Sequence, residues 1–380
     1  MNLIPLTKDL IKIPSYYDGS TNEKAVADYI FSYLKQNTRL IIEKEIVEGE
    51  RYNIVAYSPT CKSADGSFNL DTLFINHIDT VEPKQGSARD QFAAIEENGK
   101  IYGLGSVDTK GNVAILMKLA ELVKEQKCMF LFYVDEEYDF KGIKKFIDNY
   151  KRTLTVTKII SADGENLQIR NASRGIYEID ITCIGKTGHA SNPQNGVNAI
   201  RAFEKICTSV EAQLDNKPDA DLGKTTLNVS YIHGGLHKGV KNNHVELGKS
   251  GNNIADYLEA TLEFRLNTSV NGTYIVSLLE QFSKEHNVNL KIKTVRHNLE
   301  SWYTDKENLL FLEQALQKTE VVPTYTDAGL SGYVDIGLLK EVFPSICSCI
   351  GAKGKNRHGV NEYVETDSLY KLFDIFKLLI

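Results

Sequence analysis

Apolar positions in the first third of the chain predict helices that alternate with short strands. Side chains recur at helical spacing from Val26 to Leu34, after Ser20-Thr21-Asn22-Glu23, which matches a helix-capping box. Short apolar runs at 53–57, 72–78 and 128–134 predict strands, and the segment 112–125, apolar nearly all round, predicts a buried helix. This alternation indicates an α/β fold, with a mostly parallel sheet covered by helices on both faces.

The middle of the chain follows a different pattern. Apolar and polar residues alternate strictly at 177–183 and at 258–266, as in antiparallel strands that expose one face to water. Helical stretches at 197–213 and 273–286 would cover the other face. We therefore expect an inserted α+β domain at 176–292 and a main domain formed by 1–175 plus 293–380. In the last part, 344–350 predicts a buried strand, and 366–379 predicts a closing helix capped by Thr366.

Composition narrows the range of partners. Among 380 residues, 42% are hydrophobic and 25% are charged, which is typical of globular proteins, and the net charge of -6 favours neither nucleic acid nor an anionic membrane as partner. No run approaches the ~20 apolar residues of a membrane-spanning helix. Lys8 and Lys12 interrupt the first apolar run, so no signal peptide is expected. The six cysteines are expected to be reduced thiols, and the default location is cytoplasmic.

Candidate chemistry follows the predicted strands. Acids and histidines come just after five apolar or glycine-rich runs: His77 and Asp79, Asp108, the triplet Asp135-Glu136-Glu137, Asp163 and His358. In an open α/β sheet the carboxyl ends of the strands face the ligand crevice. A single histidine or acidic triplet is usually structural or solvated. Together, however, these ionised groups would repel one another unless cations compensated them, and imidazole plus carboxylate ligands suit a pair of zinc ions.

At these positions the sequence resembles a known family. The segments that carry the resemblance are His77-Ile78-Asp79, Gly105-Ser106-Val107-Asp108-Thr109-Lys110-Gly111, Asp135-Glu136-Glu137, Gly188-His189-Ala190-Ser191 and His358-Gly359-Val360-Asn361-Glu362. They look like the motif series of the co-catalytic zinc metallopeptidases and deacylases, which include aminoacylase, acetylornithine deacetylase, succinyl-diaminopimelate desuccinylase and glutamate carboxypeptidase. The resemblance implies a zinc-peptidase-like catalytic domain and a ferredoxin-like inserted domain that serves as lid and dimerisation surface.

The resemblance also implies a set of metal ligands. Asp108 would bridge two divalent metal ions, which we expect to be Zn²⁺, with Co²⁺ as an alternative. Glu137 and His358 would complete one site, while His77 and Asp163 would complete the other. Many deacetylases of the family have Glu-Pro-Thr where this chain has Asp163-Gly164-Glu165, and Glu165 is therefore an alternative ligand.

Catalytic roles are implied in the same way. Asp79 would hold the second ring nitrogen of His77 and so fix its tautomer. Glu136 would be the general base that takes a proton from the attacking water and passes it to the leaving nitrogen. His189, in the inserted domain, would donate a hydrogen bond to the tetrahedral oxyanion. In dimeric relatives this histidine comes from the partner subunit, so a homodimer formed through the inserted domain is expected.

Substrate contacts follow less directly from the resemblance. Asn253 matches the family's asparagine, although Ala255 stands where a proline is usual. Arg265 matches an arginine near the substrate carboxylate, but it could equally be a solvated strand residue. Ser331 and Gly332 resemble a turn near the substrate.

Three functions remain open at this point. The first is hydrolysis of a small N-acyl amino acid, as by acetylornithine or acetylcitrulline deacetylase. The second is a dipeptidase or carboxypeptidase with the same metal chemistry, which Asp163 favours slightly. The third, a non-catalytic binding protein on this fold, predicts loss of Glu136 or of ligands, and all of these residues are present.

Overall fold

The computed structural model describes residues 2–242, 244–330 and 332–380. The chain forms two compact units. Unit 1 contains Met1–Asn171, Tyr303–Thr326 and Val334–Ile380, and unit 2 contains Ala172–Trp302 and Asp327–Tyr333. The domain boundaries predicted from the sequence stay a proposal. They assign 1–175 plus 293–380 to the main domain and 176–292 to the inserted domain.

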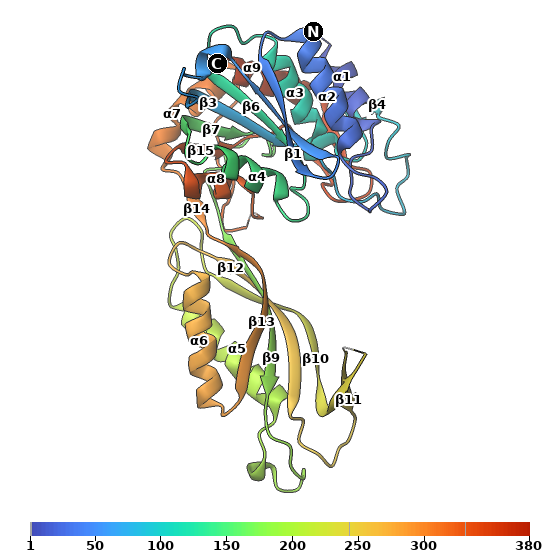
Figure 1. Ribbon diagram of the computed structural model, residues 1–380, viewed down its shortest axis with the longest axis vertical. Helices are drawn as coiled ribbons and strands as arrows, with labels where there is room; N and C mark the ends of the chain where they lie inside the picture. Colours follow the sequence, from blue (N-terminus) through green and yellow to red (C-terminus); the bar gives the residue numbers. More distant parts are fainter. Residues whose placement is uncertain (1, 243, 331) are drawn as a thin grey trace. The chain divides into compact units, whose positions relative to one another are not determined.

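Unit 1 is built on a six-stranded sheet (Figure 1). In spatial order its strands are β1 (Ile41–Glu48), β2 (Arg51–Tyr57), β6 (Cys128–Tyr133), β3 (Phe68–His77), β7 (Leu154–Ser161) and β15 (Ile346–Cys349). The last four are parallel to one another, whereas β1 and β2 form an antiparallel edge. Because β3 lies between β6 and β7, the carboxyl ends of these three strands meet at one edge of the sheet.

Helices cover both faces of this sheet (Figure 1). One face packs against α1 (Leu3–Ile11), α2 (Lys24–Asn37), α3 (Gly111–Ala120), α7 (Leu310–Lys318) and α9 (Thr366–Lys377). The other face packs against α4 (Lys141–Tyr150) and α8 (Ile336–Val342). Phe74 in the central strand stacks on Phe130 with 5.4 Å between ring centroids and contacts Phe376 of α9. The predicted mostly parallel sheet with helices on both faces is therefore confirmed.

Unit 1 also contains a small antiparallel sheet of four strands. Its strands, in spatial order, are β16 (Gly354–Lys355), β17 (Tyr363–Glu365), β5 (Lys100–Tyr102) and β4 (Ile95–Glu97). Short 3-10 helices lie at Pro59–Cys61, Pro193–Asn195 and Lys306–Leu309, and the two-residue strands are β8 (Ala172–Ser173) and β14 (Trp302–Tyr303). The small sheet matters for function because it holds together the segments that carry Asp108 and His358.

Unit 2 is a five-stranded antiparallel sheet with two helices. In spatial order its strands are β11 (His244–Gly248), β10 (Thr226–Lys241), β12 (Tyr257–Leu266), β9 (Gly175–Ile184) and β13 (Asn289–Leu299). Helices α5 (Ala199–Asp215) and α6 (Gly272–Glu285) bury the inward-facing residues of β9 and β12, such as Ile179 and Leu262. The strictly alternating segments are thus antiparallel strands, as their pattern predicts.

Two predicted helix caps are wrong. Helix α2 begins at Lys24, whose backbone N–H donates to Asn22 Oδ1 at 2.9 Å. The Glu23 carboxylate is buried against Arg51 instead of capping the helix. Thr366 is the first residue of α9 rather than its cap, and its hydroxyl donates to the Gly99 carbonyl. The side chains of Glu23 and Thr366 thus bond to distant segments instead of capping their helices.

Within the part of the chain that the structure describes, no helix has the length and apolar character needed to cross a membrane.

Candidate metal centre

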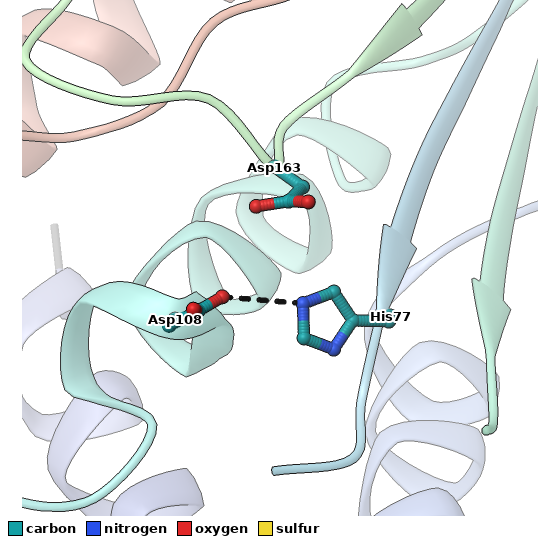
Figure 2. Close-up of side chains that lie close together, drawn as sticks. All are labelled: His77, Asp108 and Asp163. Atoms are coloured by element: carbon teal, nitrogen blue, oxygen red, sulfur yellow. Dashed lines mark ion pairs between the residues drawn. The ribbon is translucent and has the colours of Figure 1, made fainter. Parts of the chain in front are cut away.

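Three side chains converge where β3 and β7 end. His77 is the last residue of β3, Asp163 follows β7, and Asp108 comes from the kinked segment Ser106–Lys110 (Figure 2). All three are buried, and the ligand atoms of their side chains lie within 4.8 Å of one another. His77 Nε2 is 3.4 Å from Asp108 Oδ1, the pair joined in Figure 2. We call these three residues the first ligand group.

A second group forms around the other oxygen of Asp108. His358 Nε2 lies 3.1 Å from Asp108 Oδ2 and 3.0 Å from Glu137 Oε1. The ligand atoms of Asp108, Glu137 and His358 again lie within 4.8 Å of one another, and we call these residues the second ligand group. Asp108 therefore belongs to both groups and directs one carboxylate oxygen to each.

The backbone around Asp108 is held by a buried carboxylate. Glu362, at the end of the loop after His358, accepts hydrogen bonds from the N–H groups of Gly105, Val107 and Asp108 at 2.9–3.0 Å. Gly105 has a φ of +76°, and a Cβ there would lie 2.7 Å from the Thr80 side chain, so glycine suits both the turn and the space. The Asp108–Thr109 peptide is cis. These contacts fix where the shared carboxylate points.

Asp79 links the two groups. Its Oδ1 lies 3.4 Å from His77 Nδ1, and its Oδ2 accepts a hydrogen bond from the Glu137 backbone N–H at 3.0 Å. The Asp79 carboxylate thus lies beside the His77 ring and also contacts the turn that follows β6.

The electrostatics of the cluster are dominated by its carboxylates. Burial lowers the pKa of the His77 ring, but the neighbouring Asp108 and Asp79 outweigh it and hold that pKa well above its usual value. Asp108 and Glu137 raise the pKa of His358 to about 10. Burial raises the pKa of Asp108, but Arg357 and the two histidines more than offset this and keep that pKa well below its usual value. The cluster therefore attracts positive charge.

The two glutamates after β6, Glu136 and Glu137, have raised pKa values, in contrast to Asp108. Burial holds the pKa of Glu136 well above its usual value, and the nearby carboxylates of Asp335 and Asp163 raise it further. Burial also raises the pKa of Glu137. A raised pKa makes a carboxylate a stronger proton acceptor, which suits a general base.

The residues present fit a pair of divalent cations. Both ring nitrogens of His77 and Oδ1 of Asp79 are buried and have no hydrogen-bond partner among the described residues. Buried polar atoms without partners are costly, and ionised carboxylates gathered in one place are more so. Imidazole nitrogens and carboxylate oxygens are ligands that zinc prefers.

Several residues at this site were not singled out from sequence. Arg357 lies 3.1 Å from Asp163 Oδ1, and Tyr133 donates a 2.9 Å hydrogen bond to Asp335 Oδ1. Burial raises the pKa of Asp335 to about 7. The one signal for Arg357 is its position directly before His358, whereas Asp335 lies in a segment without a clear periodic pattern.

Glu165, the alternative ligand, lies outside both ligand groups. Its carboxylate pairs with Arg170 at 3.2 Å, and its side chain is 38% exposed. Asp163, and not Glu165, shares a group with His77 and Asp108.

The remaining predicted site residues belong to unit 2. His189 and Asn253 are exposed and face each other in an isolated antiparallel bridge, and His189 Nδ1 is 2.7 Å from Ser191 Oγ. Arg265, on β12, pairs with Glu263 at 2.7 Å. The Gly332 carbonyl accepts a hydrogen bond from Ser173, and Ser331 lies outside the described residues.

Comparison with curated proteins finds relatives that are named for different activities, among them deacetylases, a desuccinylase and probable carboxypeptidases. The chain is 29% identical over 252 residues to acetylornithine deacetylase of Buchnera aphidicola, a match that covers 62% of this chain and 63% of that protein. The chain thus spans less than two thirds of the length of the first curated relatives it matches. It is 26% identical to succinyl-diaminopimelate desuccinylase of Wigglesworthia glossinidia brevipalpis, with 100% of this chain and 98% of that protein covered.

Comparison with solved structures supports the fold. The chain matches an M20 family metallo-carboxypeptidase from Sulfolobus solfataricus with a TM-score of 0.73 and 18% identity, covering 100% of this chain and 98% of the other. The model of peptidase family M20/M25/M40 matches residues 73–380, a range that contains every residue of both ligand groups. On this match, which spans most of the sequence, the chain belongs to peptidase family M20/M25/M40.

Proposed function

We propose that this chain is a di-zinc amidohydrolase that cuts the amide bond of a small N-acyl amino acid. The observation that carries the proposal is the position of Asp108, which presents one oxygen to the first ligand group and one to the second. A shared carboxylate of this kind suits two metal ions ~3.5–4 Å apart. Glu136 stands directly beside the ligand Glu137 without belonging to either group.

The bound ions would polarise the substrate carbonyl and lower the pKa of water to ~7. Glu136 takes a proton from the attacking water and delivers it to the leaving nitrogen, as its raised pKa allows. Asp79 keeps the His77 ring in the tautomer that presents Nε2 to the first group. His189 donates a hydrogen bond to the oxyanion, for which its exposed ring is available.

The substrate side of the proposal rests on the relatives and on unit 2. Acetylornithine or acetylcitrulline is the proposed substrate, because a relative named acetylornithine deacetylase covers much of the chain. We propose Asn253, Arg265 and Gly332 as substrate contacts. We also propose a cytoplasmic homodimer formed through unit 2, in which His189 acts either on its own subunit or on its partner.

A dipeptidase or carboxypeptidase is the second candidate. The specific observation in its favour is Asp163, which stands in the first ligand group where many deacetylases of the family have glutamate. The structural neighbour from Sulfolobus solfataricus is described as a metallo-carboxypeptidase. Both candidates use the same metal chemistry and differ in the pocket for the leaving group.

A substrate panel separates the two candidates. The protein would be stripped of metal, reloaded with Zn²⁺ or Co²⁺, and assayed with N-acetyl amino acids, N-succinyl amino acids and dipeptides. We expect turnover of acetylornithine or acetylcitrulline and no turnover of dipeptides. The reverse pattern would establish the second candidate, and amide hydrolysis that survives complete metal removal would refute both.

A further inference from the structure

Arg357 places a positive charge beside the first ligand group. Its Nη1 lies 3.1 Å from Asp163 Oδ1 and 3.9 Å from Asp108 Oδ1. Its Nη2 donates to the Gly164 carbonyl, so the guanidinium is anchored at both ends of its fork. Only 27% of the side chain is exposed.

The two ligand groups therefore differ in charge. Arg357 contacts Asp163, which belongs only to the first group, and approaches the Asp108 oxygen that faces His77. The second group faces the other oxygen of Asp108. Each group also holds one histidine, which can give up its proton to a metal ion, so the arginine is the difference in charge between them. An arginine cannot be deprotonated in proteins, so its charge stays beside the first group under all conditions.

A substrate clamp is the obvious alternative role for this arginine. A guanidinium that binds a substrate carboxylate needs a pair of N–H groups directed at the substrate. In Arg357 each terminal nitrogen already donates one N–H, to Asp163 and to the Gly164 carbonyl, so a substrate carboxylate would have to use the N–H groups that remain or displace these partners. The geometry therefore favours a role of Arg357 toward the ligand residues over a role in binding the substrate carboxylate.

We propose that Arg357 weakens cation binding at the first ligand group, so that this chain binds its two metal ions with unequal affinity and the second ligand group fills first. The inference rests on the proposed two-metal function. A positive charge in contact with a ligand oxygen removes part of the negative potential that would attract a cation to it. Arg357 is thus a positioning residue that sets metal occupancy.

The test is a metal titration of the full-length protein. Apo protein is titrated with Zn²⁺ in competition with a chromophoric chelator, and Co²⁺ absorption spectra report the coordination of each ion as it binds. The variants are Arg357→Gln, which removes the charge, and Arg357→Lys, which keeps it. Lys355→Gln, two residues earlier and exposed, is the matched control for charge removal at a distance. Thermal unfolding of each apo protein confirms that it is folded.

For the wild type we expect two ions, bound with affinities at least about tenfold apart. Arg357→Gln should strengthen the weaker affinity roughly tenfold and leave the stronger one within about twofold. Arg357→Lys and Lys355→Gln should both behave as the wild type. This inference alone would be overturned if the wild type binds two metal ions and the weaker affinity is unchanged or reduced in Arg357→Gln. A wild-type protein that binds no metal would overturn the proposed function with it.

Discussion

The carboxyl edge of the unit 1 sheet and the His189–Asn253 bridge of unit 2 place polar residues in opposite ways. At the sheet edge, His77, Asp108 and Asp163 are buried, and each comes from a different segment. At the bridge, His189 and Asn253 are exposed, and their side chains bond to Ser191 and Ser250, which are two or three residues away in sequence.

This difference separates two kinds of functional residue. The buried cluster is positioned by packing and by hydrogen bonds such as those from Glu362, so its geometry exists before any ligand binds. The exposed pair is positioned only locally, and its contribution depends on what it meets when substrate is present. Substitutions should therefore have larger and more specific effects at the sheet edge than at the bridge.

The largest effect is expected at Glu136. Glu136→Ala removes the general base and should reduce kcat by roughly 10³–10⁴-fold, while the metal content measured by elemental analysis stays the same. The matched control is Asp139→Ala, an exposed acid on the same turn, which should leave kcat unchanged. If Glu136→Ala keeps its turnover at full metal occupancy, another group moves the proton.

The convergence of side chains at the carboxyl edge of the unit 1 sheet was also the feature most open to prediction from sequence. His77, Asp108, Glu137, Asp163 and His358 were proposed as ligands, and the structure brings all five into two groups. The convergence of these side chains was predictable because strand runs such as 72–78 are strongly apolar and a parallel sheet places their ends at one edge, whereas metal binding by them stays a prediction. The residues that support the ligands are harder to predict. Arg357 contacts Asp163 across 194 positions of sequence, and no local pattern encodes such a contact.

Local signals failed for a related reason. Glu23 fits a capping box, but the structure uses it as a buried partner of Arg51. Tertiary contacts outweigh a helix cap, because a cap contributes only about 1 kcal/mol. For unit 2 the strands were predictable from their alternation, whereas the roles of His189 and Arg265 came from a family resemblance and remain proposals.

The second-largest effect is expected at Arg51. Its guanidinium binds Glu23 through two bonds of 2.6–2.7 Å and also binds Asp135, the residue before Glu136. All three side chains are at most 4% exposed. Arg51→Met would leave two buried carboxylates without a counter-charge and should lower the free energy of unfolding by about 3–5 kcal/mol, measured by urea denaturation.

The exposed pair Arg201–Glu204 in unit 2 is the control for this prediction. Its atoms approach to 2.8 Å, but the side chains are 74% and 61% exposed. Arg201→Met should therefore change the free energy of unfolding by no more than ~1 kcal/mol. If Arg51→Met and Arg201→Met lower the free energy of unfolding equally, burial does not determine how much an ion pair contributes to stability.

His189 is expected to give the next effect. His189→Ala should reduce kcat by about 10²–10³-fold, because one oxyanion donor is removed, while metal content and stability change little. His189→Gln, which keeps a donor, should recover part of the rate. Ser191→Ala tests whether the 2.7 Å contact with Nδ1 orients the ring, and a smaller loss of kcat is expected there. A rate unaffected by His189→Ala would remove this residue from the proposed mechanism.

The smallest effect is expected at Arg265. If it binds the substrate carboxylate, Arg265→Gln should raise KM by roughly 10–100-fold, the value of a charged hydrogen bond, and should leave kcat nearly unchanged. Because Arg265 pairs with Glu263 at 2.7 Å, Glu263→Gln should release the guanidinium and lower KM. A substrate whose carboxylate is replaced by an amide should be insensitive to both variants. If KM stays constant in Arg265→Gln, the arginine serves only the strand pair, and the substrate carboxylate is recognised elsewhere.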